Sequence, residues 1–211
     1  MHVEKFCYNS DDDLAANTYV VNDDKLNAVI IDPSVDYDGI INYLEKNHLS
    51  PRCILLTHAH YDHIKGVTRL ANRYKISTFL HVKEVETLKN PRLNCSYWEE
   101  PLSVDVETSL LKGGETLKQV IDDEIIVIDT PFHTEGSVCY YFKNNKLLFS
   151  GDTLFKLSIG RDDLPTSVPE FRKASLNRIK ALPKETKVFP GHGNNTTIEY
   201  ELSFNHFLNQ Q

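Results

Sequence analysis

Short apolar runs and segments with helical spacing of apolar positions alternate along the first part of the chain. The β-branched runs at 17–21 and 27–32 flank a turn-like NDDK and predict a hairpin. Apolar positions recur at helical spacing in residues 36–49, which predicts a helix. The compact run CILLT at 53–57 predicts a buried strand, and residues 64–74 again have a helical period. This order is typical of alternating strands and helices.

The rest of the chain is richer in strands. Further strands are predicted at 77–82, 124–130, 137–142, 146–150 and 186–190. Residues 90–107 have little pattern and predict a long loop of the kind that often borders an active site. A helix is expected over 167–182, opened by a Ser167–Glu170 capping box, and a terminal helix over 197–210. Together these elements predict a mixed α/β fold. Two sheets with helices on their outer faces would fit their order, although the pattern alone does not determine this topology.

Length and composition narrow the class of protein. With 211 residues, a single domain spanning 1–211 is the better expectation. No apolar run approaches the roughly 18 residues of a membrane span, and the first residues have no signal-like apolar stretch, so we expect a cytoplasmic protein with no membrane partner. The net charge of −7, with acidic clusters at 11–13 and 122–124, disfavours nucleic acid as a partner. The four cysteines form no Cys-x-x-Cys pair, and Cys53 and Cys139 lie in apolar runs, so free buried thiols are expected.

Histidine and aspartate recur where predicted strands end. The residues concerned are His58, His60, Asp62 and His63 after the first buried strand, and His133, Asp152 and His192 after three later ones. A lone histidine is more often a surface or hydrogen-bonded residue, and His2, His48, His81 and His206 are assigned to that class. Four such strand ends, one of them a dense His-x-His-x-Asp-His, instead indicate one convergent site. Imidazole and carboxylate together are ligands for zinc, iron or manganese.

The spacing within the dense segment indicates more than one ion. Residues i and i+2 of an extended segment point to the same side, so His58 and His60 can reach one ion. Asp62 and His63 lie further along the turn and can reach a second. The full set exceeds what one tetrahedral zinc ion uses, which favours two ions.

Four segments carry a family resemblance. THAHYDHIKG, TPFHTEGSV, FSGDTLF and FPGHG resemble, in order, the signatures of the metallo-β-lactamase superfamily, and within it the glyoxalase II-like hydrolases. The resemblance implies an αββα sandwich, that is, two mixed β-sheets flanked by helices. It implies two divalent metal ions, with zinc expected first and iron or manganese as alternatives. The implied ligands are His58, His60 and His133 for the first ion, Asp62, His63 and His192 for the second, and Asp152 as the bridge.

The chain also departs from the pattern of this family. Phe132 and Ser34 stand where the family commonly has glycine, and the change at Phe132 is expected to alter the pocket wall beside His133. The sequence ends soon after His192, so we expect no C-terminal helical glutathione-binding extension of the kind that longer glyoxalase II enzymes carry, which weakens the expectation of glutathione specificity. The bridging Asp152 argues against antibiotic hydrolysis, because the true β-lactamase branches lack it.

The resemblance implies a thioesterase that acts on S-D-lactoylglutathione or a related small-molecule thioester. A metal ion lowers the pKa of bound water to about 7, so a hydroxide attacks the carbonyl carbon, with Asp62 and Asp152 as the catalytic carboxylates. A thiolate with a pKa near about 8.5 leaves without a strong general acid. Alternatives are a mononuclear-iron persulfide dioxygenase using His58, His133 and Asp152, a non-catalytic metal-binding module, and a hydrolase of another ester or lactone.

The sequence also offers candidate residues for substrate contact outside the ligand set. Arg161 is the implied substrate-binding residue for a carboxylate, with an ion pair to Asp162 or Asp163 as the competing interpretation. For Tyr97 and Trp98 in the 90–107 loop, ordinary packing is expected, with substrate contact as the alternative. A monomer or small homo-oligomer is expected.

Overall fold

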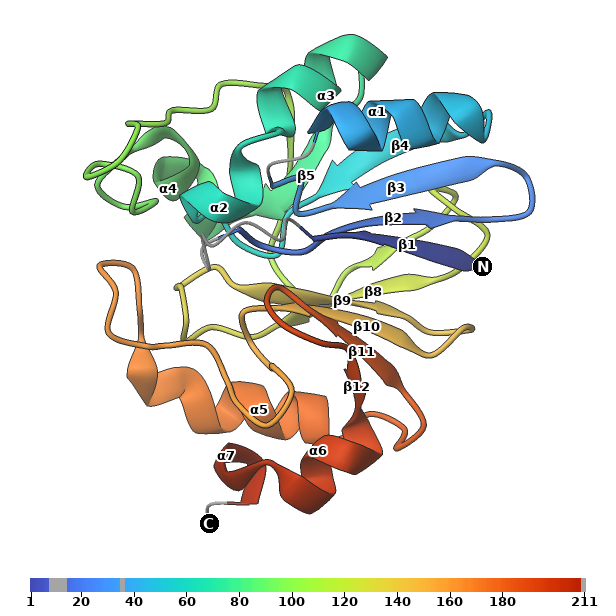
Figure 1. Ribbon diagram of the computed structural model, residues 1–211. Helices are drawn as coiled ribbons and strands as arrows, with labels where there is room; N and C mark the ends of the chain where they lie inside the picture. Colours follow the sequence, from blue (N-terminus) through green and yellow to red (C-terminus); the bar gives the residue numbers. More distant parts are fainter. Residues whose placement is uncertain (8–14, 35–36, 210–211) are drawn as a thin grey trace.

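Two six-stranded sheets form the centre of the protein, and helices cover their outer faces (Figure 1). The structure is a computed structural model and describes residues 1–7, 15–34 and 37–209. The first sheet has the order β1 His2–Phe6, β2 Thr18–Asn22, β3 Asn27–Ile31, β4 Ser50–Leu55, β5 Thr78–His81, β6 Thr108–Leu111. The second has the order β12 Thr196–Thr197, β11 Lys187–Pro190, β10 Leu147–Gly151, β9 Val138–Phe142, β8 Ile125–Asp129, β7 Thr116–Leu117. The expected αββα sandwich of two mixed sheets is confirmed.

The helices divide between the two outer faces. They are α1 Tyr37–Lys46, α2 Tyr61–Ile64, α3 Val67–Tyr74, η1 Val82–Glu84 and α4 Val85–Lys89 on the side of the first sheet, and η2 Pro169–Phe171, α5 Arg172–Lys180, α6 Ile198–Phe204 and α7 His206–Asn209 on the side of the second. Within the described residues, no helix is both long and apolar enough to cross a bilayer.

Alternation along the strands produces three apolar layers. Val20 and Ile30 point toward α1 and α3, where they pack with Leu44 and other buried residues. Their strand neighbours Val21 and Val29 point the other way, into the space between the sheets, because successive side chains of a strand face opposite sides. A third layer joins the outer face of the second sheet to α5, α6 and α7. Each sheet is therefore buried on both faces.

Several sequence-based boundaries differ from the structure. Strands β1, β6, β7 and β12 were not predicted. The predicted capping box is wrong, because the Ser167 hydroxyl donates to the carbonyl of His133 at 2.7 Å and accepts from the N–H of Leu164, and regular α-helix begins only at Arg172. The terminal helix is broken at Asn205, whose side chain accepts from the N–H of Phe207 and so starts α7. The acidic cluster at 11–13 lies outside the described residues.

The predicted loop at 90–107 and the predicted free, buried thiols of Cys53 and Cys139 are confirmed. The loop, all of which is described, contains no helix or strand. All four cysteines are free; Cys53 and Cys139 are buried, Cys95 is half-buried and Cys7 is exposed.

Candidate metal centre

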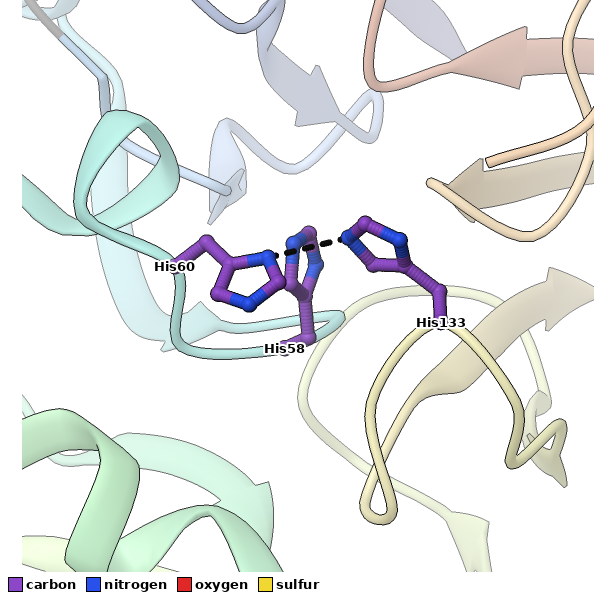
Figure 2. A group of neighbouring side chains, drawn as sticks. All are labelled: His58, His60 and His133. Atoms are coloured by element: carbon purple, nitrogen blue, oxygen red, sulfur yellow. Dashed lines mark hydrogen bonds between the residues drawn. The ribbon is translucent and has the colours of Figure 1, made fainter. Parts of the chain in front are cut away.

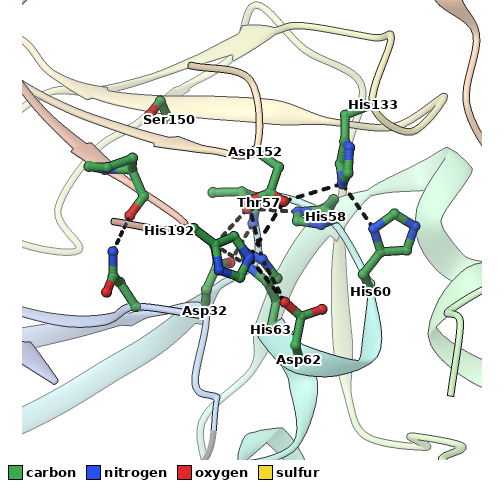
Figure 3. Close-up of polar contacts among 12 residues, drawn as sticks. Asp32, Thr57, His58, His60, Asp62, His63, His133, Ser150, Asp152 and His192 are labelled. Carbon is green, nitrogen blue, oxygen red and sulfur yellow. Dashed lines mark hydrogen bonds and ion pairs between the residues drawn. The ribbon is translucent and has the colours of Figure 1, made fainter. Parts of the chain in front are cut away.

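Seven histidine and aspartate side chains meet at one edge of the sandwich, between the two sheets (Figure 3). The loop after β4 and the short helix α2 supply four of them, and the segments after β8, β10 and β11 supply one each. Strands β3 and β4, like β10 and β11, run parallel, so their carboxyl ends deliver side chains to the same edge. The residues are His58, His60, Asp62, His63, His133, Asp152 and His192.

The first group consists of His58, His60 and His133, all buried (Figure 2). His60 Nδ1 lies 2.9 Å from His133 Nε2. The three rings meet edge to face, with centroids 4.7–4.8 Å apart. Two segments that are 73 residues apart in the chain thus bring their imidazole nitrogens to one point.

The second group consists of Asp62, His63 and His192. His192 Nε2 lies 3.1 Å from Asp62 Oδ2, and His63 Nε2 lies 3.6 Å from the same oxygen. Asp152 stands between the groups: its Oδ1 is 3.3 Å from His63 Nε2, whereas its Oδ2 is 3.5 Å from His133 Nε2 and 3.6 Å from His192 Nε2. The carboxylate therefore faces both groups at once.

The donor set fits divalent metal ions. Ligand atoms within each of the two groups lie within 4.8 Å of one another. The Nε2 atoms of His58, His60 and His63 and the Oδ1 of Asp152 are buried without a hydrogen-bond partner among the described residues. Buried polar atoms without partners carry a free-energy cost, which bound metal ions would relieve. The assignment of the seven residues as metal ligands stays a prediction, and their arrangement is compatible with it.

The histidines of the two groups differ in how their surroundings shift the pKa. Burial lowers the pKa of His58 well below its usual range, and burial together with His133 lowers the pKa of His60 to about 3. Burial opposes ionisation of Asp152, but nearby His63 outweighs it and the pKa lies well below the usual value. At neutral pH His58 and His60 are thus unprotonated and Asp152 is ionised, the forms that coordinate metals. Burial lowers the pKa of His63 and His192 as well, but the neighbouring carboxylates outweigh it and raise both values, so these two rings would release a proton when an ion binds.

Three partners fix the rings of the candidate ligands. The Thr57 hydroxyl lies 3.1 Å from Nδ1 of His58, and the Asp32 carboxylate lies 3.0 Å from Nδ1 of His63. The backbone carbonyl of Arg161 lies 2.7 Å from Nδ1 of His133. In each case Nδ1 is occupied and Nε2 is left facing the centre, which is how outer partners orient metal-binding histidines. Neither Thr57 nor Asp32 was predicted from the sequence, although both stand at strand ends as the ligands do.

A buried carboxylate, Glu84, joins the two loops that supply the first group. One oxygen accepts from the N–H of Ala59, which lies between His58 and His60, and the other accepts from the N–H of Gly136, three residues after His133; both bonds are 2.9 Å. Burial raises the pKa of Glu84, and these hydrogen bonds oppose that rise. Sequence reasoning missed this residue, because nothing local distinguishes it from the exposed Glu86.

Gly191 permits the close packing of the centre. A Cβ atom at this position would stand 2.2 Å from Asp152 Oδ1 and 2.8 Å from a ring carbon of His63. Any larger residue would displace the carboxylate that faces both groups.

Two residues singled out in the sequence lie differently from expectation. Phe132 is fully buried and packs in the layer beneath the second sheet with Leu176, so it supports the loop of His133 from below and does not form a pocket wall. The Arg161 guanidinium is exposed and makes a two-pronged pair with Asp163 at 2.7 and 2.9 Å, the competing interpretation of this residue.

Comparison with known protein families matches residues 11–192 to the metallo-beta-lactamase superfamily. The chain belongs to this superfamily. The "Probable metallo-hydrolase YqgX" of Bacillus subtilis is 34% identical over 200 residues, which cover 93% of each chain. A "Hydroxyacylglutathione hydrolase" of Pelagibacter ubique is 31% identical over 176 residues, which cover 83% of this chain and 65% of that protein.

Solved structures of the metallo-beta-lactamase superfamily agree with the fold. The chain resembles the BLEG-1 B3 metallo-beta-lactamase with a TM-score of 0.91 and 37% identity, covering 99% of this chain and all of the other. It resembles TTHA1623 in a di-iron-bound form with a TM-score of 0.83 and 33% identity, covering 92% of this chain and 96% of that one. Superfamily membership and the His/Asp cluster together make the protein a metallo-hydrolase.

Proposed function

We propose that the protein is a binuclear thioesterase of the glyoxalase II type, which hydrolyses S-D-lactoylglutathione or a related small-molecule thioester. The observation that carries the proposal is the Asp152 carboxylate, whose two oxygens face both ligand groups. One carboxylate between two triads suits a paired-metal site. The similarity to the Pelagibacter hydroxyacylglutathione hydrolase supports the same activity.

Two divalent ions in such a site supply a Lewis acid and hydroxide at neutral pH. The residues of the chain hold and orient this centre. Asp152 would bridge the ions, and Asp62, paired with His192 at 3.1 Å, would bind the second and face the reacting water. No further side chain in the four motifs is an evident general acid, which suits a thiolate leaving group with a pKa near about 8.5 better than an amine. This favours thioesters over amides.

The test pairs elemental analysis with hydrolysis of S-D-lactoylglutathione on one preparation. We expect about two metal ions per chain, and loss of at least about a hundredfold in kcat/KM for His58→Ala and Asp152→Ala. His206→Ala, an exposed histidine on α7, is the matched control and should retain activity. Zinc is the expected metal, and iron is measured as well because the related TTHA1623 was solved with two irons.

Two other outcomes would indicate a different function. One iron per chain with persulfide-dependent oxygen uptake and no thioester hydrolysis would indicate a persulfide dioxygenase. Hydrolysis of a β-lactam at a higher kcat/KM than any thioester would indicate the activity named for BLEG-1, against which Asp152 argues. Two metals with slow turnover of lactoylglutathione would keep the thioesterase chemistry and point to another thioester.

A further inference from the structure

A pocket of about 470 Å³ lies between the 90–107 loop and the segment that follows β10. Its lining residues are Arg92, Cys95, Tyr97, Trp98, Leu164 and Pro165. Both segments lie at the left of the molecule as drawn in Figure 1, where α2 and α4 also lie. The volume falls within the usual range of small-molecule sites.

Hydrogen bonds tie both walls of this pocket to the candidate metal centre. The carbonyl of Asn94 accepts from the N–H of Tyr61, the residue between His60 and Asp62, at 2.9 Å. On the other wall, the Ser167 hydroxyl accepts from the N–H of Leu164 and donates to the carbonyl of His133. The pocket is therefore built on the same loops that carry ligands of both groups.

The Cys95 thiol of the pocket lies close enough to the centre for its charges to act on it. Burial raises the pKa of the Cys95 thiol, and the negative charge of Asp62 raises it further, whereas Arg161 lowers it. A pocket-lining side chain is thus within the field of a candidate ligand of the second ion.

The lining combines aromatic surface with a cation. Trp98 is 89% exposed, so the expectation of ordinary packing is wrong for this residue. Its ring meets that of Tyr97 edge to face at 4.9 Å. The Arg92 guanidinium lies 4.7 Å from the centre of the Tyr97 ring, and among the described residues no carboxylate is within ion-pair distance of it. An exposed tryptophan beside a cation without a counter-charge is typical of a binding surface.

We propose that this pocket binds the non-reacting part of the substrate, and that this part is an aryl or branched alkyl group carrying a carboxylate. The aromatic rings would cover the apolar body, and Arg92 would pair with the carboxylate. The inference rests on the proposed thioesterase function and narrows its substrate class. It also transfers the carboxylate-binding role from Arg161, whose guanidinium Asp163 already occupies, to Arg92. The group is carried on either the acyl or the thiol side of the thioester.

The binding test uses the intrinsic fluorescence of the protein, because Trp98 is the single tryptophan of the chain. Metal-loaded protein is titrated with 3-phenylpropionate and with 3-phenylpropionamide. We expect a saturable change in emission, with the carboxylate bound about tenfold more tightly than the amide. Arg92→Gln should abolish this preference, and Phe204→Ala, an exposed aromatic on α6, should keep it. Absence of a saturable change, or an unaltered preference in Arg92→Gln, overturns the proposal; the latter would place the carboxylate on the metals.

A kinetic test identifies which half of the substrate enters the pocket. One series varies the acyl group on N-acetylcysteamine, acetyl against 3-phenylpropanoyl, and the other varies the thiol of acetyl thioesters, ethanethiol against benzyl mercaptan. In one series Trp98→Ala should lower the aryl-to-alkyl ratio of kcat/KM about tenfold. An unchanged ratio in both series overturns the proposal. If the wild type hydrolyses no thioester at all, the proposed function fails, while the fluorescence titration still decides the pocket.

Discussion

One oxygen of the buried Glu84 carboxylate accepts a hydrogen bond of 2.9 Å from the backbone N–H of Gly136, across 52 residues of chain. The other oxygen holds the N–H of Ala59. Glutamine has a single acceptor oxygen, so Glu84→Gln should leave one buried N–H facing an amide NH₂ group, at a cost of about 1–3 kcal/mol in the free energy of unfolding.

Because both loops carry the first ligand group, Glu84→Gln should also weaken the first metal site more than the second. We expect metal content to fall toward one ion per chain on dialysis. Thermal unfolding and elemental analysis measure the two effects, and Glu86→Gln, exposed on α4, is the control. Full metal content with normal stability in Glu84→Gln would show that the two loops hold their positions without it.

Asp32 should determine the affinity of the second site. Its carboxylate accepts from the N–H and hydroxyl of Thr57 and lies 3.0 Å from Nδ1 of His63. Asp32→Asn would present an NH₂ group to these donors and allow the His63 ring to turn, so we expect metal affinity to fall about 10–100-fold. Competition with a chromophoric chelator measures this, and Asp24→Asn is the exposed control. Wild-type affinity in Asp32→Asn would contradict an orienting role.

Removal of metal should lower the thermal stability of the protein. A ligand that binds only the folded state adds RT ln(1 + [L]/Kd), about 4 kcal/mol at a thousandfold excess over Kd. The orphaned imidazole nitrogens would also lose their partner. We expect a chelator to lower Tm by several degrees and added zinc to restore it, as followed by calorimetry. An identical Tm with and without the chelator would mean that no ion was bound.

Asp23 gives a prediction on pH that is independent of the metals. Burial raises its pKa, but bonds from Asn27, Asp122 and Lys25 outweigh this, and the folded-state pKa lies below 3.8. The stabilisation is therefore present above about pH 3.8 and is lost as pH falls through the folded pKa. Asp23→Asn should lower the free energy of unfolding by about 1–2 kcal/mol at neutral pH. The difference from the wild type should become smaller as the pH falls. Urea titrations at several pH values test this against Asp24→Asn; a difference that does not change with pH would contradict it.

The sequence was most informative where chemistry and strand ends coincide. All seven predicted ligand residues meet in space, because parallel strands such as β10 and β11 end at the same edge. The two-residue strands β7 and β12 could not be predicted, since two residues have no periodicity. Glu84 has a role that only the fold creates, because it is an ordinary charged residue in the sequence until two distant loops pack around it. The role proposed for Arg92 likewise depends on the pocket that the folded 90–107 loop forms with Leu164 and Pro165.

The division of the ligand residues between the sheets has a mechanical consequence. Each sheet is built from one contiguous half of the chain. Each ligand group contains residues from both halves. On the proposed assignment, every ion is a cross-link between halves, closing a loop of 73 residues between His60 and His133 alone. The ions would then serve a free-thiol protein as disulfides serve secreted ones, resisting separation of the layers. A substitution that loosens the packing between the sheets, far from any ligand, would therefore increase the rate of metal dissociation before it unfolds the protein.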